Sequence, residues 1–264
     1  HPPSRPCPSP ERPQAGRRRQ HHQFGCEAIG DSDPALDAEV IQLAWQFYVS
    51  LGLSRLRLLL NSIGCTECRP AYVEKLKEYY REIAAGLCGD CQERLVRNPL
   101  RLLDCKQVAC LRAAEQAPRS IDYLCPACRE HFERLQRYLK LLDIPFVLDH
   151  RLVRGLDYYS RTVFEVQPIG IGGAQSTVGG GGRYDGLIAE LGGRAAPAVG
   201  FATGLERIVL NLVEEGIKVP PLPQPRLMVA YLGETAREEA IRLTAELRRE
   251  GVAAVMSMGD KSLK

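Results

Sequence analysis

The first part of the chain alternates between two kinds of side chain with a period of two. One parity is polar and the other apolar, with Arg17, Arg19, His21, Gln23 and Glu27 set against Phe24, Cys26 and Ala28. Successive side chains of a β-strand point to opposite faces. The pattern therefore predicts a strand with one polar face and one face against a core.

A helix and a second strand are expected next. Ser32 or Asp33 can cap a helix that begins at Pro34, and apolar residues then recur at helical spacing until Gly52. The leucine-rich segment 53–60 carries arginines between its leucines. This segment predicts another strand.

The middle of the chain changes character. Residues 62–147 are rich in Cys, Arg and Lys and have helical periodicity without a clear strand, which predicts an inserted helical module. Strands are expected to return at 146–148 and to continue through a tyrosine-containing segment. Residues 178–185 predict a strand end that runs into a glycine-rich turn, and the apolar stripe at 205–213 predicts a helix that Gly216 ends.

A proline-rich segment separates the last part of the chain from the rest. Residues 219–225 predict a stiff linker. Segments 227–232, 235–250 and 252–256 then predict strand, helix and strand, the opening of a βαβ-type domain. Because domains rarely fold below ~50 residues, we expect residues 226–264 to be a truncated piece of such a domain.

Composition and charge exclude several classes of protein. The formal net charge of +3 over 264 residues is close to neutral, so it does not indicate a nucleic-acid binder. No apolar run approaches the ~18 residues of a membrane span. Residues 1–10 are proline-rich, lack the apolar core of a secretory signal and are not expected to pack. The ten cysteines indicate a reducing compartment, and we predict a cytoplasmic protein.

The helical module contains three Cys-x-x-Cys pairs, with two more cysteines between the second and third. The pairs are Cys65 and Cys68, Cys88 and Cys91, and Cys125 and Cys128, and the additional residues are Cys105 and Cys110. Four thiolates suffice for one tetrahedral structural zinc ion. The spacing leaves open which pairs meet and whether one ion or two are bound, and the alternative is a set of buried thiols. We favour zinc at the three pairs.

The segment between Arg154 and Glu165 contains several polar side chains that could bind a substrate. Arg154 keeps its positive charge at any working pH. Tyr158 and Tyr159 add aromatic rings with polar tips. The combination suits a small polar substrate that carries an anionic group, whereas the alternative is a strand end with a surface arginine.

At three places the chain resembles the histidyl-tRNA synthetase family. Residues 154–159 (Arg-Gly-Leu-Asp-Tyr-Tyr) resemble the signature of that family. Residues 11–17 (Glu-Arg-Pro-Gln-Ala-Gly-Arg), with Gln23 and Glu27, resemble motif 2 of class II synthetases in its histidine-specific form. Residues 200–207 (Gly-Phe-Ala-Thr-Gly-Leu-Glu-Arg) resemble motif 3.

The resemblance implies a fold and a reaction. The fold is α+β: an antiparallel catalytic sheet with helices, a Cys-rich helical insertion and part of an α/β anticodon-binding domain. The reaction is the activation of histidine with ATP and Mg²⁺ to histidyl-adenylate, followed by transfer to the 3′ end of tRNA(His), in a parent enzyme that is a homodimer. The expected boundaries are 1–61 and 148–217 for the two parts of the catalytic domain, 62–147 for the insertion, 218–225 for the linker and 226–264 for the truncated anticodon-binding domain.

The resemblance also implies roles for individual residues. Glu11 would lie beside the adenine or ribose of ATP, and Arg17 and Arg207 would hold the triphosphate. Arg154 would be the catalytic cation beside the reacting carboxylate and α-phosphate, where fixed charges stabilise the transition state. Histidine would be bound by Gln23, Glu27, Tyr158, Tyr159, Gly181 and Gly182. The plain alternatives are a solvent-facing arginine at position 207 and a loose turn at the glycines.

The chain departs from the pattern of the family at its start. Ser9 stands where the family carries the arginine that contacts the α-phosphate, and a hydroxyl does not replace that charge. Motif 1, which builds the dimer interface of class II synthetases, has no counterpart in the chain. We therefore expect that residues 1–10 are not native sequence and that this chain neither dimerises normally nor charges tRNA.

Two other functions compete with a ligase. The first is the regulatory subunit of ATP phosphoribosyltransferase, a relative that senses histidine without catalysis. The second is a zinc-dependent nucleic-acid module in an unrelated protein. The tyrosine pair and the arginines Arg17, Arg154 and Arg207 favour the enzyme over both.

Overall fold

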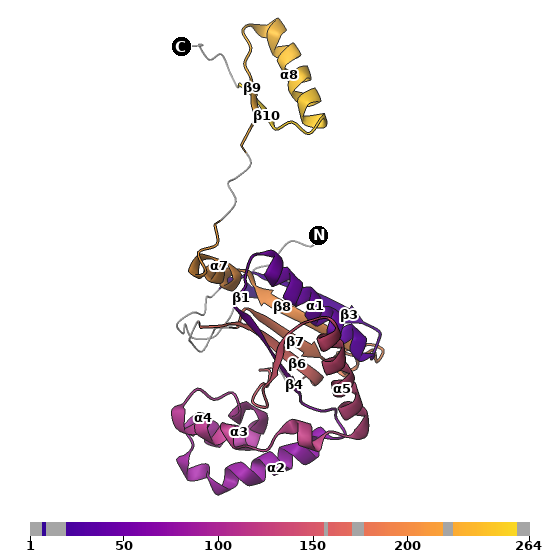
Figure 1. The fold of residues 1–264 in the computed structure, drawn as a ribbon, viewed down its shortest axis with the longest axis vertical. Coiled ribbons are helices and arrows are strands. Elements are labelled where there is room, and N and C mark those ends of the chain that lie inside the picture. The colour runs from indigo at the N-terminus through magenta and orange to yellow at the C-terminus, as the bar shows by residue number, and fades with distance from the viewer. Residues whose placement is uncertain (1–6, 9–19, 156–157, 171–176, 219–223, 258–264) are drawn as a thin grey trace. The chain divides into compact units, whose positions relative to one another are not determined.

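The computed structural model describes residues 7–8, 20–155, 158–170, 177–218 and 224–257. The chain divides into two compact units, His1–Ile217 and Lys218–Lys264. Each unit is described by itself (Figure 1).

The first unit is built on a six-stranded sheet in the order β3-β8-β7-β6-β4-β5. These strands are β3 (Gln23–Ile29), β4 (Leu56–Ser62), β5 (Phe146–Leu148), β6 (Ser160–Pro168), β7 (Gly179–Arg183) and β8 (Ala198–Gly204). All neighbouring strands in this sheet are antiparallel except β4 and β5. A further short pair, β1 (Cys7–Pro8) and β2 (Gln20–His21), is antiparallel. The predicted α+β class with an antiparallel sheet is confirmed.

Two long helices pack on one face of the sheet. They are α1 (Pro34–Ser50) and α5 (Pro126–Leu141), and α7 (Leu205–Glu214) follows β8. The core between α1 and the sheet contains Ile41, Tyr48, Phe164 and Phe201, all at most 2% exposed. The predicted cap is present, because the Asp33 side chain accepts a hydrogen bond from Ala35 N at 2.8 Å.

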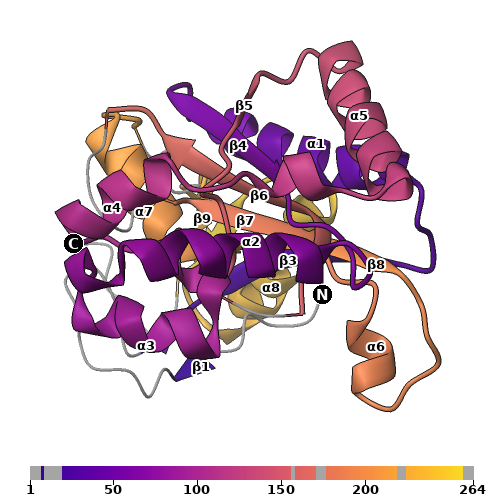
Figure 2. The same ribbon diagram turned by 90° about the horizontal axis from the view of Figure 1, so that it is seen from below.

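The predicted insertion is a helical module with its own core. It contains α2 (Arg69–Glu82), α3 (Gly89–Arg97), α4 (Val108–Glu115) and the 3-10 turns Ala84–Gly86, Pro99–Leu102 and Ser120–Tyr123. Residues 63–145, all of them described, contain no strand. Figures 1 and 2 show α2, α3 and α4 as a group separate from α1 and α5. The module buries Tyr72, Leu76 and Tyr80 against residues of the opposite sheet face, including Leu59 and Val163.

The predicted glycine-rich turn at 179–182 is wrong, because these glycines form strand β7 itself in the middle of the sheet. A Cβ on Gly179 would lie 2.9 Å from Thr203 Cβ and would also meet the hydroxyl of Tyr48 on α1. A Cβ on Gly181 would lie 2.7 Å from Phe201 Cα. Glycine usually weakens a strand, but here it allows the close approach of β8 and α1.

A buried ion pair, which the sequence did not reveal, joins β7 to α1. Arg183 is 0% exposed and donates from Nε to both carboxylate oxygens of Asp37, at 3.3 and 3.1 Å, and again from Nη2. Its Nη1 donates to Asp185 Oδ1 at 3.1 Å. Burial raises the pKa of Asp37, but the neighbouring His131, 3.6 Å away, and the hydrogen bonds from Arg183 outweigh this effect and hold the pKa below its ordinary value.

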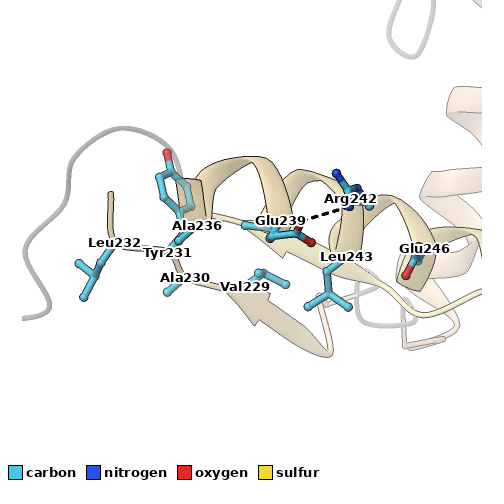
Figure 3. Close-up of a pocket in the computed structure, with 10 residues that line it drawn as sticks. Val229, Ala230, Tyr231, Leu232, Ala236, Glu239, Arg242, Leu243 and Glu246 are labelled. Carbon is cyan, nitrogen blue, oxygen red and sulfur yellow. Dashed lines mark ion pairs between the residues drawn. The ribbon is translucent and has the colours of Figure 1, made fainter. Parts of the chain in front are cut away.

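The second unit contains β9 (Leu227–Val229), α8 (Glu234–Arg249) and β10 (Ala254–Met256), with the two strands parallel. A surface hollow of about 640 Å³ lies between the end of β9 and α8 (Figure 3). Leu232 and Leu243 line it, together with Glu239 and Arg242, which form an ion pair at 3.1 Å along α8. None of the described helices combines the length and apolarity that crossing a membrane requires.

Candidate active site

The face of the sheet opposite α1 has a floor of very small residues. Residues directly opposite each other on paired strands point to the same face. Glu27 therefore shares a row with Gly200 and Gly182 across β3, β8 and β7. The adjacent row of this face is Gly25, Ala202, Gly180 and Glu165. The glycines of this face leave room for other side chains, because Tyr159 lies over Gly182 and Arg154 lies over Gly180.

Three tyrosines and a carboxylate stand at one side of the floor. The rings of Tyr158 and Tyr159 are 4.7 Å apart between centroids, and Tyr184 lies 5.7 Å and 6.3 Å from them. The Tyr184 hydroxyl donates a short hydrogen bond to Glu27 Oε2. A Cβ at Gly182 would lie 2.9 Å from the Tyr159 ring, so glycine allows this ring to approach the floor.

Partial burial changes the titration of these groups. It raises the pKa of Glu27 above its ordinary value. Burial, together with the neighbouring Tyr159 and Glu27, raises the pKa of Tyr158 to about 12. Tyr158 therefore remains a neutral phenol at physiological pH, able both to donate and to accept a hydrogen bond.

A chain of contacts links the two described arginines of the predicted site. Arg154 Nη1 donates to Glu165 Oε1 at 2.5 Å, and its guanidinium lies 5.9 Å from the centroid of the Tyr159 ring. Thr177 Oγ1 donates to Glu165 Oε2 at 2.8 Å. Arg207 Nη1 donates to the Thr177 carbonyl at 2.8 Å. Arg154 and Arg207 therefore lie in one region, and Arg207 is half-buried rather than turned to solvent.

A second contact supports the start of α7, where Arg207 lies. His22 Nδ1 is 2.7 Å from Glu206 Oε1, and His22 N donates to both Glu206 oxygens at 3.1 Å. The hydrogen bond with His22 is the largest cause that lowers the pKa of Glu206, to about 2. The contact holds the beginning of β3 against the beginning of α7.

The structure brings most of the predicted histidine and nucleotide residues together. Gln23 is exposed on the Glu27 face of β3 and pairs with Gly204, directly before α7. Gly181 lies in the row of Phe164 and Phe201 that faces α1, so within the predicted glycine pair Gly182 is the one on the Glu27 face. The predicted positions Glu11 and Arg17 lie outside the described residues.

Sequence reasoning gave too little weight to three residues of this site. The Tyr184 hydroxyl meets Glu27 only through the pairing of β7 with β8 and β3, which its position in the chain does not show. Glu165 was visible as a carboxylate near Arg154, but the contact was not predictable from its position on β6. Thr177 carried no sequence signal, since its contacts to Glu165 and Arg207 come from three separate segments.

The cysteines of the insertion form two separate clusters. Cluster 1 contains Cys65, Cys68, Cys125 and Cys128, and cluster 2 contains Cys88, Cys91, Cys105 and Cys110. In each cluster the four Sγ atoms lie within 4.8 Å of one another, so each cluster could hold a metal ion. The structure thus shows that the first and third pairs meet, and that the second pair meets Cys105 and Cys110.

One thiol in each cluster has a pKa below its ordinary value. Burial raises the pKa of Cys65, but hydrogen bonds from the backbone of Cys68 and Glu67 outweigh it and lower the pKa to about 7. A backbone hydrogen bond from Cys91 is the largest cause that lowers the pKa of Cys88. Thiolate is the form that binds metal.

The chain is similar to known proteins over most of its length. Residues 9–208 match the model of the family described as Histidyl-tRNA synthetase. The histidine–tRNA ligase of Dehalococcoides mccartyi (strain ATCC BAA-2266 / KCTC 15142 / 195) is 59% identical over 254 residues, which cover 96% of this chain and 60% of that protein. The crystal structure of apo S. aureus histidyl-tRNA synthetase is similar with a TM-score of 0.72 and 36% identity, over 93% of this chain and 60% of that one.

A second solved structure is similar in fold alone. It is titled an ATP phosphoribosyltransferase regulatory subunit/histidyl-tRNA synthetase from Bacillus halodurans C, with 23% identity and a TM-score of 0.60 over 94% of this chain and 66% of that one. The chain spans about three fifths of the length of the curated relatives it matches.

Proposed function

Because this chain belongs to the histidyl-tRNA synthetase family, we propose that it forms the catalytic part of a histidine–tRNA ligase. The reaction joins the carboxylate of histidine to the α-phosphate of ATP, releases pyrophosphate and then transfers the histidyl group to the 3′ end of tRNA(His). One observation carries the proposal: Glu27, three tyrosines and Arg154 stand around a single floor of glycine and alanine.

Histidine would lie on the floor with its ammonium group toward Glu27. An ammonium group that leaves water needs an anionic partner, and the hydrogen bond from Tyr184 orients the Glu27 carboxylate. The hydroxyls of Tyr158 and Tyr159 suit the two nitrogens of an imidazole, which can each donate or accept. Gln23 lies further along the same face of β3.

ATP, as its Mg²⁺ complex, would extend from the reacting carboxylate toward α7. Arg154 would stabilise the charge that develops on the α-phosphate, and Glu165 and Tyr159 hold its guanidinium in place before the reaction. Arg207 would bind the far end of the triphosphate. By resemblance, Arg17 would assist there and Glu11 would lie at the nucleoside.

The remaining assignments belong to the same proposal. Residues 62–147 form the insertion, 218–225 the linker and 226–264 a part of the anticodon-binding domain. Both cysteine clusters bind zinc, the ligase acts as a homodimer on tRNA(His), and it works in the cytoplasm. Zinc is the expected ion because four thiolates at tetrahedral spacing are typical of its structural sites.

The test is ligand-induced stabilisation of the purified chain. L-histidine and MgATP together should raise the Tm, because ligands that bind only the native state stabilise it. L-phenylalanine should not, since it lacks the imidazole nitrogens. Histidine-dependent exchange of pyrophosphate into ATP by the parent enzyme is the second readout, since this chain by itself is expected to be inactive.

Two results would contradict the ligase. Absence of any response to histidine would reject the whole site. Stabilisation by histidine that MgATP never increases, without pyrophosphate exchange, would instead favour the histidine-sensing regulatory subunit of ATP phosphoribosyltransferase.

A further inference from the structure

Cluster 1 has the dimensions of a single metal site. The Sγ atoms of Cys65 and Cys68 are 3.7 Å apart, and those of Cys65 and Cys125 are 3.9 Å apart. Four sulfurs bound tetrahedrally at ~2.3 Å from one zinc ion are about 3.8 Å from one another. A disulfide would need ~2.0 Å. These separations fit one ion and exclude cross-linked thiols.

This cluster joins the two chain segments that enter and leave the group of helices α2, α3 and α4. Cys65 and Cys68 follow β4 directly, and Cys125 and Cys128 begin α5. Cluster 1 packs in the core between α1 and the sheet. Cluster 2 packs in the separate core of the insertion. The two clusters therefore have different structural surroundings.

Arg69 connects cluster 1 to the tyrosine wall of the candidate site. It follows Cys68 directly and is the first residue of α2. Its Nη2 donates to the Tyr159 carbonyl at 2.5 Å and to the Gly64 carbonyl at 3.1 Å, and its Nε donates to the Ile63 carbonyl at 3.3 Å. The Arg69 guanidinium thus connects the metal loop, the segment 63–68 that carries Cys65 and Cys68, to Tyr159, whose ring lies under Arg154.

The backbone of the metal loop also pairs with the strand that follows Tyr159. Ile63 N donates to the Arg161 carbonyl and Arg161 N donates to the Gly64 carbonyl, each at 2.8 Å. Arg161 has a φ of 52° at the point where the register of β6 shifts. Gly64 has a φ of 72°, and a Cβ there would lie 2.8 Å from Cys68 Sγ. The loop, the cluster and the irregular start of β6 therefore fit together as one unit.

We propose that a zinc ion held by Cys65, Cys68, Cys125 and Cys128 positions the Tyr158–Tyr159 wall through Arg69. The ion in cluster 2 holds the insertion together without this role. The inference that the wall receives histidine rests on the proposed function, whereas the coupling of the ion to the wall does not.

The first measurement is metal content by mass spectrometry of the purified chain. The wild type should hold two zinc ions, and Cys65→Ser with Cys68→Ser should hold one. Cys88→Ser with Cys91→Ser is the matched control and should also hold one. An unchanged metal content in the first variant would overturn the proposal.

The second measurement is hydrogen exchange of the peptide 158–164. Loss of the cluster 1 ion should increase its exchange at least several-fold, and loss of the cluster 2 ion should not. Arg69→Met should give the same increase while both ions remain bound, and Arg69→Lys should restore part of the protection. Arg101→Met is the control, because Arg101 pairs with Asp104 inside the insertion at 3.1 Å and reaches the loop before β6 through a longer contact of 3.4 Å to the Gly155 carbonyl.

The third measurement is histidine affinity by calorimetry. Arg69→Met should weaken histidine binding about tenfold and leave ATP binding alone unchanged, a split that general destabilisation would not produce. A wild-type chain that binds no histidine would count against the proposed function only. If the peptide 158–164 of Arg69→Met exchanges hydrogen as slowly as in the wild type, only the positioning role is contradicted.

Discussion

Arg154 donates from Nη1 to Oε1 of Glu165 at 2.5 Å, so a residue of the loop before β6 is anchored to the middle of that strand. The same carboxylate accepts hydrogen bonds from Gln167 and Thr177. A charge held by several fixed partners needs little reorganisation when a reaction creates a new charge beside it.

Replacement of Arg154 by lysine should slow catalysis more than it weakens binding. Lysine keeps the charge but loses the planar fork that reaches Glu165 and the substrate together. In the parent enzyme we expect the rate of histidine-dependent pyrophosphate exchange to fall about 100-fold, with a small change in the Kd of histidine. Arg151→Lys is the control, since Arg151 contacts Asp149 in the same loop. Equal effects in the two variants would disprove the assignment of Arg154.

Replacement of Glu27 by glutamine should act on histidine binding. The change removes the anion that would meet the ammonium group, a charged hydrogen bond that contributes ~1.5–3 kcal/mol. Calorimetry should show histidine affinity lower by about tenfold to 100-fold. Glu39→Gln, on the exposed side of α1, should bind histidine as the wild type does. Wild-type affinity in Glu27→Gln would remove this residue from the site.

Replacement of Gly200 by alanine should disturb the floor. The new methyl group would lie 2.8 Å from the Cys26 carbonyl and would collide with the Glu27 carboxylate. We expect the free energy of unfolding to fall by about 1–3 kcal/mol, as is typical of an overpacked position. We also expect histidine binding to be lost. Gly86→Ala is the control, because a Cβ there meets nothing within 4 Å. Denaturant titration measures the unfolding of both variants. Similar midpoints for Gly200→Ala and Gly86→Ala would refute the close approach of Glu27 to Gly200.

Breaking the buried pair of Arg183 and Asp37 should cost more than any surface change. Arg183→Met leaves the buried Asp37 carboxylate with His131, at 3.6 Å, in place of the guanidinium, and breaking a buried ion pair typically destabilises by about 3–5 kcal/mol. The double variant with Asp37→Leu should recover much of that loss, because two apolar side chains leave no unpaired charge. Lys75→Met, in an exposed pair with Glu78, should change the free energy of unfolding little. A double variant no more stable than Arg183→Met would show that packing, rather than charge, accounts for the loss.

Glu206 should make stability depend on pH in the acid range. Its folded pKa of about 2 lies below the ordinary value of 4.5, so the carboxylate contributes stability above pH 4.5. This contribution should decrease as the pH falls from 4.5 toward 2, since the folded state resists the proton that the unfolded state takes up. Glu206→Gln should flatten the curve of unfolding free energy against pH in that window. An unchanged curve would contradict the lowered pKa.

Local patterns in the sequence determined the elements of the fold. The cap at Asp33, the leucine-rich strand β4 and the apolar stripe that predicts α7 all depend on residues close together in the chain. Such patterns encode periodicity and capping directly. The motifs that identify the family are likewise continuous strings, so Glu27, Arg154 and the tyrosine pair could be predicted from the sequence.

Tertiary structure decided the contacts between segments that are far apart. The sequence left open which cysteine pairs meet, and only the return of the chain at α5 brings Cys125 beside Cys65. The glycine run looked like a turn because its close approach to Phe201 and Tyr48 comes from other elements. The contact of Tyr184 with Glu27 and the Arg183–Asp37 pair have the same origin, since pairing register and helix packing place these residues together across more than 140 positions.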